Sequence, residues 1–307
     1  MERKLLAMPA DATPLPRLRT VDAPPHLYFV VSAVFHYLGP SFAVLLFARV
    51  QVLGVAWLRI ASAAVIFAAW RRPWRAFAEL DRDGRRLLIA WGAVLAVMNA
   101  CFYSAISRLP LGTVSAIEFL PVIALAAIGV RSSRNLLALA LAVAGVYLLT
   151  DIRLAGAAVG FAFAFANAVL FSLYIVLADR VAKRATLSGI DGLAAAMLIA
   201  AVVVTPIGGW QAAPAFLDPV ALLAGIGVGV SSSVIPYVTD QLAMARLPRA
   251  TYATMVALLP ALATVIGIVV LAQIPGWVEV AGLALVVAGV GLHRPTRVTD
   301  HPTPPRD

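Results

Sequence analysis

The sequence predicts an all-α fold, a polytopic membrane protein with ten transmembrane helices in two inverted five-helix repeats. Three observations predict it. Hydrophobic residues make up 62% of the 307 residues and charged residues only 13%, about half the usual share of a soluble protein. Ten apolar stretches are long enough to cross the ~30 Å hydrocarbon core as helices. Similar segments recur in the same order in the two halves of the chain.

The ten stretches are separated by short connections that carry charges, Pro, Gly or Asp. They are 26–48, 51–70, 86–107, 110–130, 134–151, 156–179, 188–209, 219–245, 250–272 and 274–293. We expect disordered cytoplasmic tails at 1–25 and 294–307, because both segments are polar and rich in proline.

Positive charge predicts the orientation of the spans. With the N-terminus in the cytoplasm, the inner segments hold 20 Lys or Arg residues, and the outer connections hold only Arg49, Arg108 and Arg153. Cytoplasmic loops carry the excess of Lys and Arg in membrane proteins, so both termini are expected inside. Because this bias explains the net charge of +9, the charge does not indicate nucleic-acid binding. Four tryptophans near span ends agree with an interfacial belt: Trp70, Trp74, Trp210 and Trp277.

Two pairs of segments indicate an internal duplication. LALAVAGVYLL at 139–149 matches LALVVAGVGLH at 283–293 in eight of eleven positions, and AISRLPLGT at 105–113 shares Ala, Arg, Leu, Pro and Thr with AMARLPRAT at 243–251. Chance similarity between Ala- and Leu-rich helices explains the first match better than the second. Since five spans are an odd number, a second copy enters the membrane from the opposite side. The predicted repeats are 26–151 and 156–293, an architecture found in many secondary transporters.

Three ionisable residues lie at membrane depth: Arg59, Glu118 and Asp240. Such residues usually face the interior of the bundle and mark substrate or ion paths. Arg59 and Glu118 both lie about eight residues from the outer ends of their spans, roughly 12 Å deep, so they could meet. Either they form a structural ion pair, or they bind a charged substrate and Glu118 carries a proton. Asp240 lies nearer the cytoplasmic end of its span. Its role is either structural, in which case it reaches the membrane interface or pairs with Arg246, or functional, in which case it lines a cavity.

Four helical faces combine small and polar residues, which favours a shared polar cavity over packing alone. They comprise Ser32, His36 and Gly39; Gly92, Ala96, Asn99 and Tyr103; Gly160, Asn167, Phe171 and Tyr174; and Gly229, Ser232, Ser233, Pro236 and Asp240. Proline adds candidate helix breaks at Pro40, Pro121, Pro236 and Pro260. Pro121 and Pro260 occupy corresponding spans, a pattern that points to a binding region, although proline kinks also serve packing.

The ordered set of polar motifs resembles the EamA-type members of the drug/metabolite transporter superfamily, and within them the threonine/homoserine type of exporter. The resemblance covers about residues 26–293. It is carried by WLRIASA with Arg59, RRPWR at 71–75, MNACFYSAISRLPLG at 98–112, the Glu118-Phe119 pair, PYVTDQLAMARLP at 236–248 and LPALATVIG at 259–267. Asp240 falls where this pattern carries a glutamate. The chain departs from the pattern at Leu259-Pro260 and Ala272-Gln273, where the family favours Glu-Pro and Gly-Glu.

The resemblance implies export of small metabolites across the bacterial inner membrane. We therefore expect a secondary exporter of amino acids such as threonine or homoserine, or of related small metabolites, driven by protons. The alternatives are an exporter of uncharged drugs or metabolites, and a non-transporting receptor or scaffold. An intramembrane enzyme is disfavoured, because the sequence has no HExxH, GxSxG or P-loop motif, and we expect no metal and no cofactor.

The predicted topology is tested by reporter fusions at Asp218 and Arg306. The two fusions should report opposite sides of the membrane, with Arg306 in the cytoplasm, because the arginine bias places both termini there. A periplasmic reporter signal at Arg306 would contradict the ten-span model.

Overall fold

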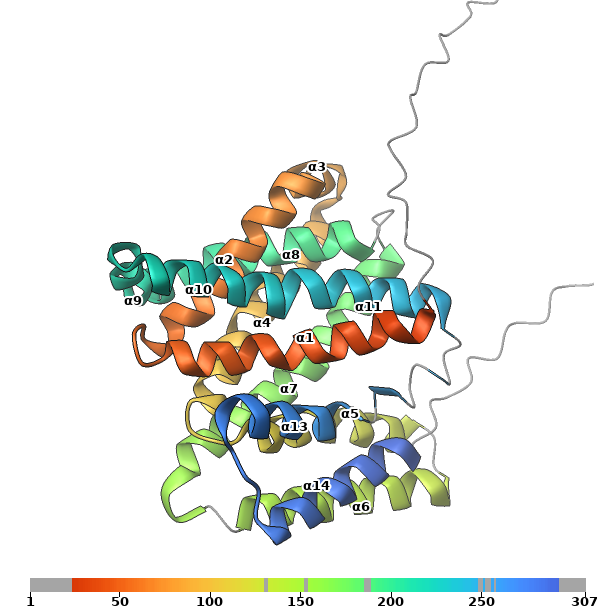
Figure 1. The fold of residues 1–307 in the computed structure, drawn as a ribbon. Coiled ribbons are helices and arrows are strands. Elements are labelled where there is room, and N and C mark those ends of the chain that lie inside the picture. The colour runs from red at the N-terminus through yellow and green to blue at the C-terminus, as the bar shows by residue number, and fades with distance from the viewer. Residues whose placement is uncertain are drawn as a thin grey trace, which may run out of the picture.

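The computed structural model describes residues 24–129, 132–151, 154–184, 189–247, 251, 255–256 and 258–292. These residues form helices and turns and contain no strand (Figure 1). The α-helices are α1 (Pro25–Leu46), α2 (Val52–Arg71), α3 (Pro73–Glu79), α4 (Arg82–Ile106), α5 (Leu111–Gly129), α6 (Ser133–Asp151), α7 (Leu154–Arg184), α8 (Gly189–Val204), α9 (Trp210–Ala212), α10 (Pro219–Gly229), α11 (Ile235–Arg246), α13 (Leu259–Leu271) and α14 (Trp277–Leu292). Two π-helical turns, η1 (Thr205–Gly209) and η3 (Val230–Val234), and one 3₁₀ turn, η2 (Ala213–Leu217), complete the set.

The prediction of an all-α polytopic membrane protein is confirmed. Among the described residues, six helical stretches are long and apolar enough to cross a membrane, and four shorter helices are also apolar. The long ones are Pro25–Leu46, Val52–Arg71, Arg82–Ile106, Ala157–Val181, Ile190–Leu217 and Pro219–Asp240; the short ones are Leu111–Pro121, Ser133–Leu149, Leu259–Leu271 and Trp277–Leu292. The arrangement of these helices as two inverted repeats stays a prediction.

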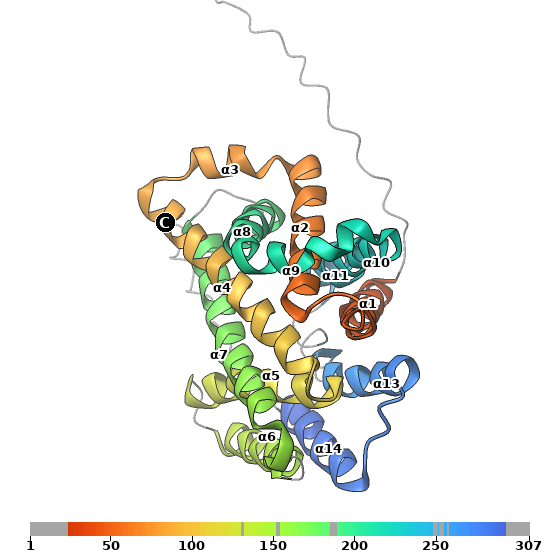
Figure 2. The same ribbon diagram turned by 90° about the vertical axis from the view of Figure 1, so that its left-hand side faces the viewer.

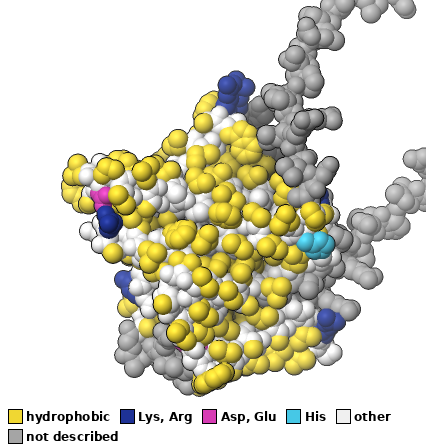
Figure 3. All heavy atoms as spheres, viewed as in Figure 1, with side chains coloured by type: hydrophobic (Ala, Val, Ile, Leu, Met, Phe, Trp, Pro, Cys, Tyr) yellow, Lys and Arg dark blue, Asp and Glu magenta, His cyan; other side chains and the backbone are white. Residues whose placement is uncertain are grey.

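The surface agrees with a lipid environment. In the view of Figure 3, hydrophobic side chains cover most of the visible face and charged groups lie mainly at its edges. Val65, Val202 and Val269 are 68%, 67% and 77% exposed and belong to this largely apolar surface, as expected for a surface that faces lipid. The four tryptophans expected at the interfaces are all exposed, as tryptophans at a membrane interface usually are: Trp70, Trp74, Trp210 and Trp277.

Several expectations fall partly outside the described residues. They concern both tails, apart from Pro24 and Pro25, and parts of the stretch 250–272.

Two features were missed by the sequence analysis: the short helix α3 in the connection 71–86, and the π-helical turns inside the seventh and eighth stretches. The helix α3 starts where Arg72 adopts a positive φ of 51° directly before Pro73, which ends α2 and sets the first turn of α3.

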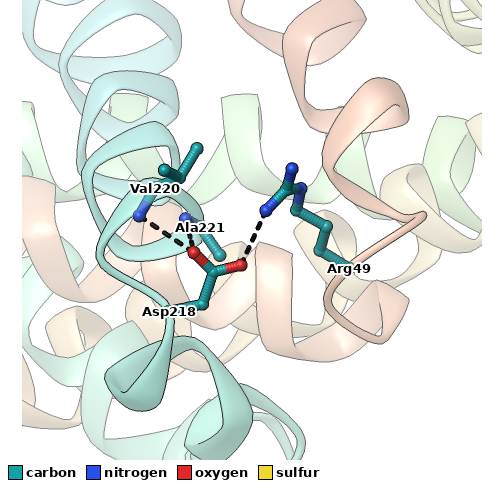
Figure 4. Close-up of polar contacts among 4 residues, drawn as sticks. All are labelled: Arg49, Asp218, Val220 and Ala221. Carbon is teal, nitrogen blue, oxygen red and sulfur yellow. Dashed lines mark hydrogen bonds and ion pairs between the residues drawn. The ribbon is translucent and has the colours of Figure 1, made fainter.

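The connection before α10 is held by a helix cap and an exposed ion pair. The carboxylate of Asp218 accepts hydrogen bonds from the backbone N–H of Val220 and Ala221 at 3.0 and 3.2 Å, and Arg49 Nη1 donates to Asp218 Oδ2 at 2.9 Å (Figure 4). The Arg49 hydrogen bond, followed by that of Ala221, holds the pKa of Asp218 below its usual value. A lowered pKa means that this contribution to stability is present above the usual carboxyl pKa and is lost as pH falls through the lowered value. The contact is therefore intact at neutral pH.

The helices form two connected groups. In Figures 1 and 2, α1 lies beside α10 and α11, and α2 and α8 lie behind them, while α5, α6, α13 and α14 form the opposite end. The helices α4 and α7 pack along each other and span both groups (Figure 2). One buried core, which includes Tyr37, Tyr103 and Ile117, extends from α1 to α14; a second, which includes Phe67, Trp91 and Met197, joins α2, α4, α7 and α8.

The two matched segments of the sequence pack against each other as antiparallel helices, α6 and α14. A Cβ atom added to Gly145 would lie 2.5 Å from Gly282 O, and one added to Gly289 would lie 2.6 Å from Ala138 O. Gly145 and Gly289 are equivalent in the alignment of 139–149 with 283–293, and so are Ala138 and Gly282. The two close contacts are therefore reciprocal, and glycine is needed at both because the backbones approach so closely.

Gly145→Ala should destabilise the protein. The added methyl group meets a backbone oxygen that cannot move without shifting α14, and overpacking of this kind costs about 1–3 kcal/mol. The thermal unfolding midpoint of the purified protein in detergent measures the effect. Gly227→Ala is the matched control, because a Cβ atom there meets nothing within 4 Å. Equal midpoints for the two variants would show that the α6–α14 contact does not require glycine.

Candidate functional site

Arg59 forms the centre of the buried polar site. It lies on α2 with 7% of its surface exposed. Its Nε donates to Ser233 Oγ at 3.1 Å, its Nη2 donates to the carbonyl oxygen of Ser232 at 3.2 Å, and its Nη1 donates to Asn99 Oδ1. The guanidinium also lies over the ring of Tyr103, 5.5 Å from the ring centre. All three nitrogens are thus used, and every hydrogen-bond acceptor is neutral.

The acceptor at Ser232 exists because of Pro236. In an α-helix the N–H of residue 236 would bond to the oxygen of residue 232, but proline has no N–H. The chain passes this point as the π-helical turn η3, and the carbonyl of Ser232 accepts from Arg59 instead. Pro236 is in turn fixed to α1, since Ser32 Oγ donates to its carbonyl at 3.1 Å. Gly39 of α1 permits this proximity, because a Cβ atom there would lie 2.7 Å from the backbone nitrogen of Ser232.

Glu118 lies on α5 with 8% of its surface exposed and accepts a hydrogen bond of 3.2 Å from Asn167 Nδ2 on α7. The sequence suggested that Glu118 could meet Arg59 as an ion pair. That form of the prediction is wrong for this structure: the ion pairs found among the described residues do not include one between them. Arg59 is held by neutral oxygens on α4 and η3, so its charge does not require the carboxylate as a direct partner.

Hydroxyl and aromatic groups line the region around Glu118. Tyr37 of α1, which is 1% exposed, forms a hydrogen bond of 2.7 Å with Ser115, one turn before Glu118. His36 lies beside Tyr37 with its ring edge-on at 5.2 Å between ring centres. The Oδ1 atom of Asn167 is buried and has no hydrogen-bond partner in the described part of the chain. A buried acceptor of this kind is costly and indicates a place where a ligand or water binds.

Tyr174 belongs to an aromatic cluster rather than to the hydrogen-bonded centre. Its ring is 5.6 Å from that of Trp91 and stacks on Phe171 at 6.4 Å, and Phe171 meets Phe119 edge-on at 6.4 Å. The cluster joins α4, α5 and α7. It contains Phe171 and Tyr174 of the face predicted on α7, but its residue on α4, Trp91, was not in the face predicted there.

Asp240 lies on α11, seven residues after Ser233, which corresponds to about 10 Å along the helix. Its side chain is half-buried and the structure places it apart from the contacts of Arg59. Tyr237 lies between them and was not among the predicted site residues. Its side chain is partly buried and packs against the core that joins α2, α4, α7 and α8. Its position directly after Pro236 was the one signal in the sequence that could have identified it.

The four prolines do not act alike. Pro236 directly follows the π-helical turn η3 as the second residue of α11, within the continuous helical stretch Pro219–Asp240, and Pro260 is the second residue of α13. Pro40 and Pro121 do not interrupt α1 and α5, which continue through them. A break at those two positions was therefore a wrong expectation. Membrane helices tolerate an internal proline because neighbouring groups satisfy the freed backbone atoms.

Comparison with known proteins agrees with this architecture. The sequence model of the EamA-like transporter family matches residues 158–293. The threonine/homoserine exporter RhtA of Salmonella typhimurium is 32% identical over 257 residues, covering 81% of this chain and 84% of the relative, and RhtA of Escherichia coli K12 is 31% identical over 253 residues with the same coverage. A solved crystal structure superposes with a TM-score of 0.57 at 17% identity and covers 87% of this chain and 96% of that one, which supports the fold alone.

The fold and the buried polar site define a multi-pass membrane transporter. The chain belongs to the EamA-like transporter family of the drug/metabolite transporter superfamily, as the identity and coverage of the RhtA relatives show. It is similar to exporters of the threonine/homoserine type. The resemblance stated from the sequence motifs is thereby confirmed.

Arg59→Lys should weaken both folding and transport. A lysine ammonium is a point charge and cannot reproduce the planar fork that reaches Asn99 and both serines. Loss of one or two charge-assisted hydrogen bonds should lower the free energy of unfolding by roughly 1–3 kcal/mol. Thermal unfolding in detergent measures this, with Arg86→Lys as control, since the Arg86 side chain is 82% exposed. An unfolding midpoint as high as that of the control would show that the hydrogen bonds of the Arg59 guanidinium do not stabilise the protein.

Proposed function

We propose that this protein exports threonine- or homoserine-like amino acids, or related small metabolites, in exchange for protons. It acts in the bacterial inner membrane with both termini in the cytoplasm. The amino-acid class is taken from the names of the RhtA relatives and from the charges of the buried site.

The observation that carries the proposal is a pair of buried opposite charges that are not bonded to each other. Arg59 is held by Asn99, Ser232 and Ser233, and Glu118 is held by Asn167. A charge at the centre of a membrane costs ~3 kcal/mol even on translocon scales, so each must have a function or a partner. An amino acid supplies both partners: its carboxylate binds the guanidinium and its ammonium binds Glu118. Asn167 Oδ1 is a further acceptor for the ammonium.

Proton exchange follows from the chemistry of a single carboxylate. Glu118 cannot hold a proton and bind an ammonium group at the same time with equal strength, because protonation removes its negative charge. A proton that arrives from outside displaces the amino acid, and an amino acid that arrives from the cytoplasm displaces the proton. Competition at one group therefore couples the two movements in opposite directions. Asp240 lies nearer the cytoplasmic end and provides a second acid for proton transfer in this scheme.

Two sets of reciprocal contacts support two inverted repeats, 26–151 and 156–293, as the basis of alternating access. The first is the α6–α14 contact at Gly145 and Gly289. The second involves Arg108 and Arg246, which are equivalent in the alignment of 105–113 with 243–251. Arg108 Nη1 donates to the carbonyl four residues earlier, that of Ser104, and Arg246 Nη1 likewise donates to that of Leu242.

The aromatic partners of these two arginines also correspond. The guanidinium of Arg108 lies over Phe163 of α7 at 5.5 Å, and that of Arg246 lies over Tyr28 of α1 at 5.2 Å. In the predicted repeats α1 and α7 are the first helices of the two copies. Equivalent contacts at opposite ends of the bundle are what a twofold axis in the membrane plane produces.

Glu118→Gln should abolish proton-coupled export while the protein still folds. The amide oxygen of glutamine can accept the same hydrogen bond from Asn167, and Arg59 keeps its three acceptors. Export of labelled threonine and homoserine from proteoliposomes with an imposed pH gradient measures the effect. Asp83→Asn is the control, because the Asp83 side chain is 65% exposed at the start of α4.

Full export by Glu118→Gln would overturn the proposed role of the carboxylate. Export of an uncharged compound, together with no export of any amino acid by the unaltered protein, would favour the alternative of a drug or neutral-metabolite exporter.

A further inference from the structure

A second polar cavity lies at one end of the bundle, away from Arg59 and Glu118. It has a volume of about 460 Å³ and is formed where α4 meets α5 and where α13 meets α14. By the predicted topology this end faces the outside of the cell. The volume is within the range of small-molecule sites, which is roughly 300–1,000 Å³.

The cavity wall carries one cation, Arg108. Its Nη1 donates to the carbonyl of Ser104 at 2.7 Å and to Ser107 Oγ at 2.9 Å, and its guanidinium lies over Phe163. These contacts fix the position of the side chain. Arg108 is exposed, and its Nε and Nη2 atoms donate to no described residue, so these two nitrogens are accessible to water or to a ligand that enters the cavity.

The N-terminus of α5 lies on the same wall. Gly112 and Thr113 are in the first turn of this helix, where backbone N–H groups have no partner within the helix. The N–H of Leu111 is already bound by Gln273 Oε1 at 3.1 Å. Thr113 is 3% exposed, and its hydroxyl makes no hydrogen bond with any described residue. The hydroxyl oxygen is not among the fully buried atoms that lack a partner, so it opens on the cavity and is available to a ligand there, independently of the helix end.

The cavity also carries one carboxylate, Glu279, in the first turn of α14. It is 6% exposed, and its Oε2 accepts a hydrogen bond from Gly276 N at 2.8 Å. In the alignment that pairs 139–149 with 283–293, the equivalent of Glu279 is Asn135, which is 0% exposed at the start of α6. The matching first turn of α6 therefore carries a neutral residue in place of a carboxylate. Glu279 thus gives the start of α14 a negative charge that the matching start of α6 lacks.

We propose that this outer cavity is a second binding site for a small zwitterionic amino acid. The ligand's carboxylate binds Arg108 and the N–H groups of Gly112 and Thr113, and its ammonium binds Glu279. Thr264, whose hydroxyl donates to Pro260 O at 2.9 Å, provides an acceptor for a side-chain hydroxyl of the ligand. The inference uses the amino-acid chemistry of the proposed function but does not depend on the central site. In export, such a site receives the amino acid as it leaves the central site.

Thiol protection tests the cavity directly. Cys101 is the sole cysteine of the chain, so Cys101→Ser gives a background without thiols. Ile274→Cys places a thiol at the cavity, since Ile274 lines it and is 80% exposed. In the purified full-length protein in detergent, threonine at ten times its Kd should slow maleimide labelling of this thiol about tenfold. Leu217→Cys is the matched control: Leu217 is 89% exposed, outside the cavity lining, and should label at the same rate with and without threonine.

Two ligand analogues and three variants give the chemical specificity. Threoninol, which lacks the carboxylate, and 2,3-dihydroxybutyrate, which lacks the ammonium, should not protect. Arg108→Gln and Glu279→Gln should each abolish protection by threonine, whereas Arg86→Gln should leave it intact. Absence of protection, equal protection of both thiols, or full protection in Arg108→Gln would each overturn the proposal.

The outer site is separated from the central site by adding Glu118→Gln. Protection of the Ile274→Cys thiol should persist in this variant, although export is lost. Loss of protection would mean that the central site alone binds threonine and would reject the outer site. Conversely, protection of the thiol by threonine, combined with no amino-acid export by the protein that keeps Glu118, would reject the proposed function and retain the outer site. Equilibrium binding of radiolabelled threonine to Glu118→Gln, compared with the double variant that also carries Arg108→Gln, gives the same answer without any cysteine substitution.

Discussion

The buried guanidinium of Arg59 is the interaction on which the interior of this protein depends. A permanent positive charge inside a membrane protein requires acceptors on several sides, and here they come from α4 and from the π-helical turn η3. Asn99 is oriented for this task because its Nδ2 donates to Leu95 O at 2.8 Å, which turns its Oδ1 toward Arg59. The three elements are therefore tied together at one charged group.

The proline after η3 supplies the acceptor that makes this arrangement possible. A regular helix has no spare carbonyl in its interior, and Arg59 needs one at Ser232. Pro236 removes the competing N–H, and Ser32 of α1 binds the carbonyl of Pro236 itself. The irregular helical segment around Pro236 thus provides carbonyl groups that bind Arg59 of α2 and Ser32 of α1.

Opposite charges are kept apart at both polar places in the structure. In the centre, Arg59 and Glu118 are each held by neutral groups, and in the outer cavity Arg108 and Glu279 are each fixed by backbone contacts. A direct ion pair would satisfy both charges and leave little for a ligand to gain. Arg108 and Arg246 each lie over an aromatic ring, whereas the aligned positions Glu279 and Asn135 differ in charge.

The sequence by itself determined the membrane class, the positions of the apolar stretches and the family, because each depends on local composition and on short motifs. It also identified Arg59, Asn99, Tyr103, Ser232 and Ser233, since polar residues in apolar helices are rare and face inward. Only the tertiary structure decided which of them bond. Counting residues along each span predicts that Arg59 and Glu118 lie at the same depth in the membrane. Depth does not determine how each helix is rotated or which helices pack against it. These follow from packing: from Gly39 beside η3, from Asn99 facing α2, and from Asn167 facing α5. The outer cavity was beyond the sequence for the same reason, because its walls come from two helix connections more than 150 residues apart.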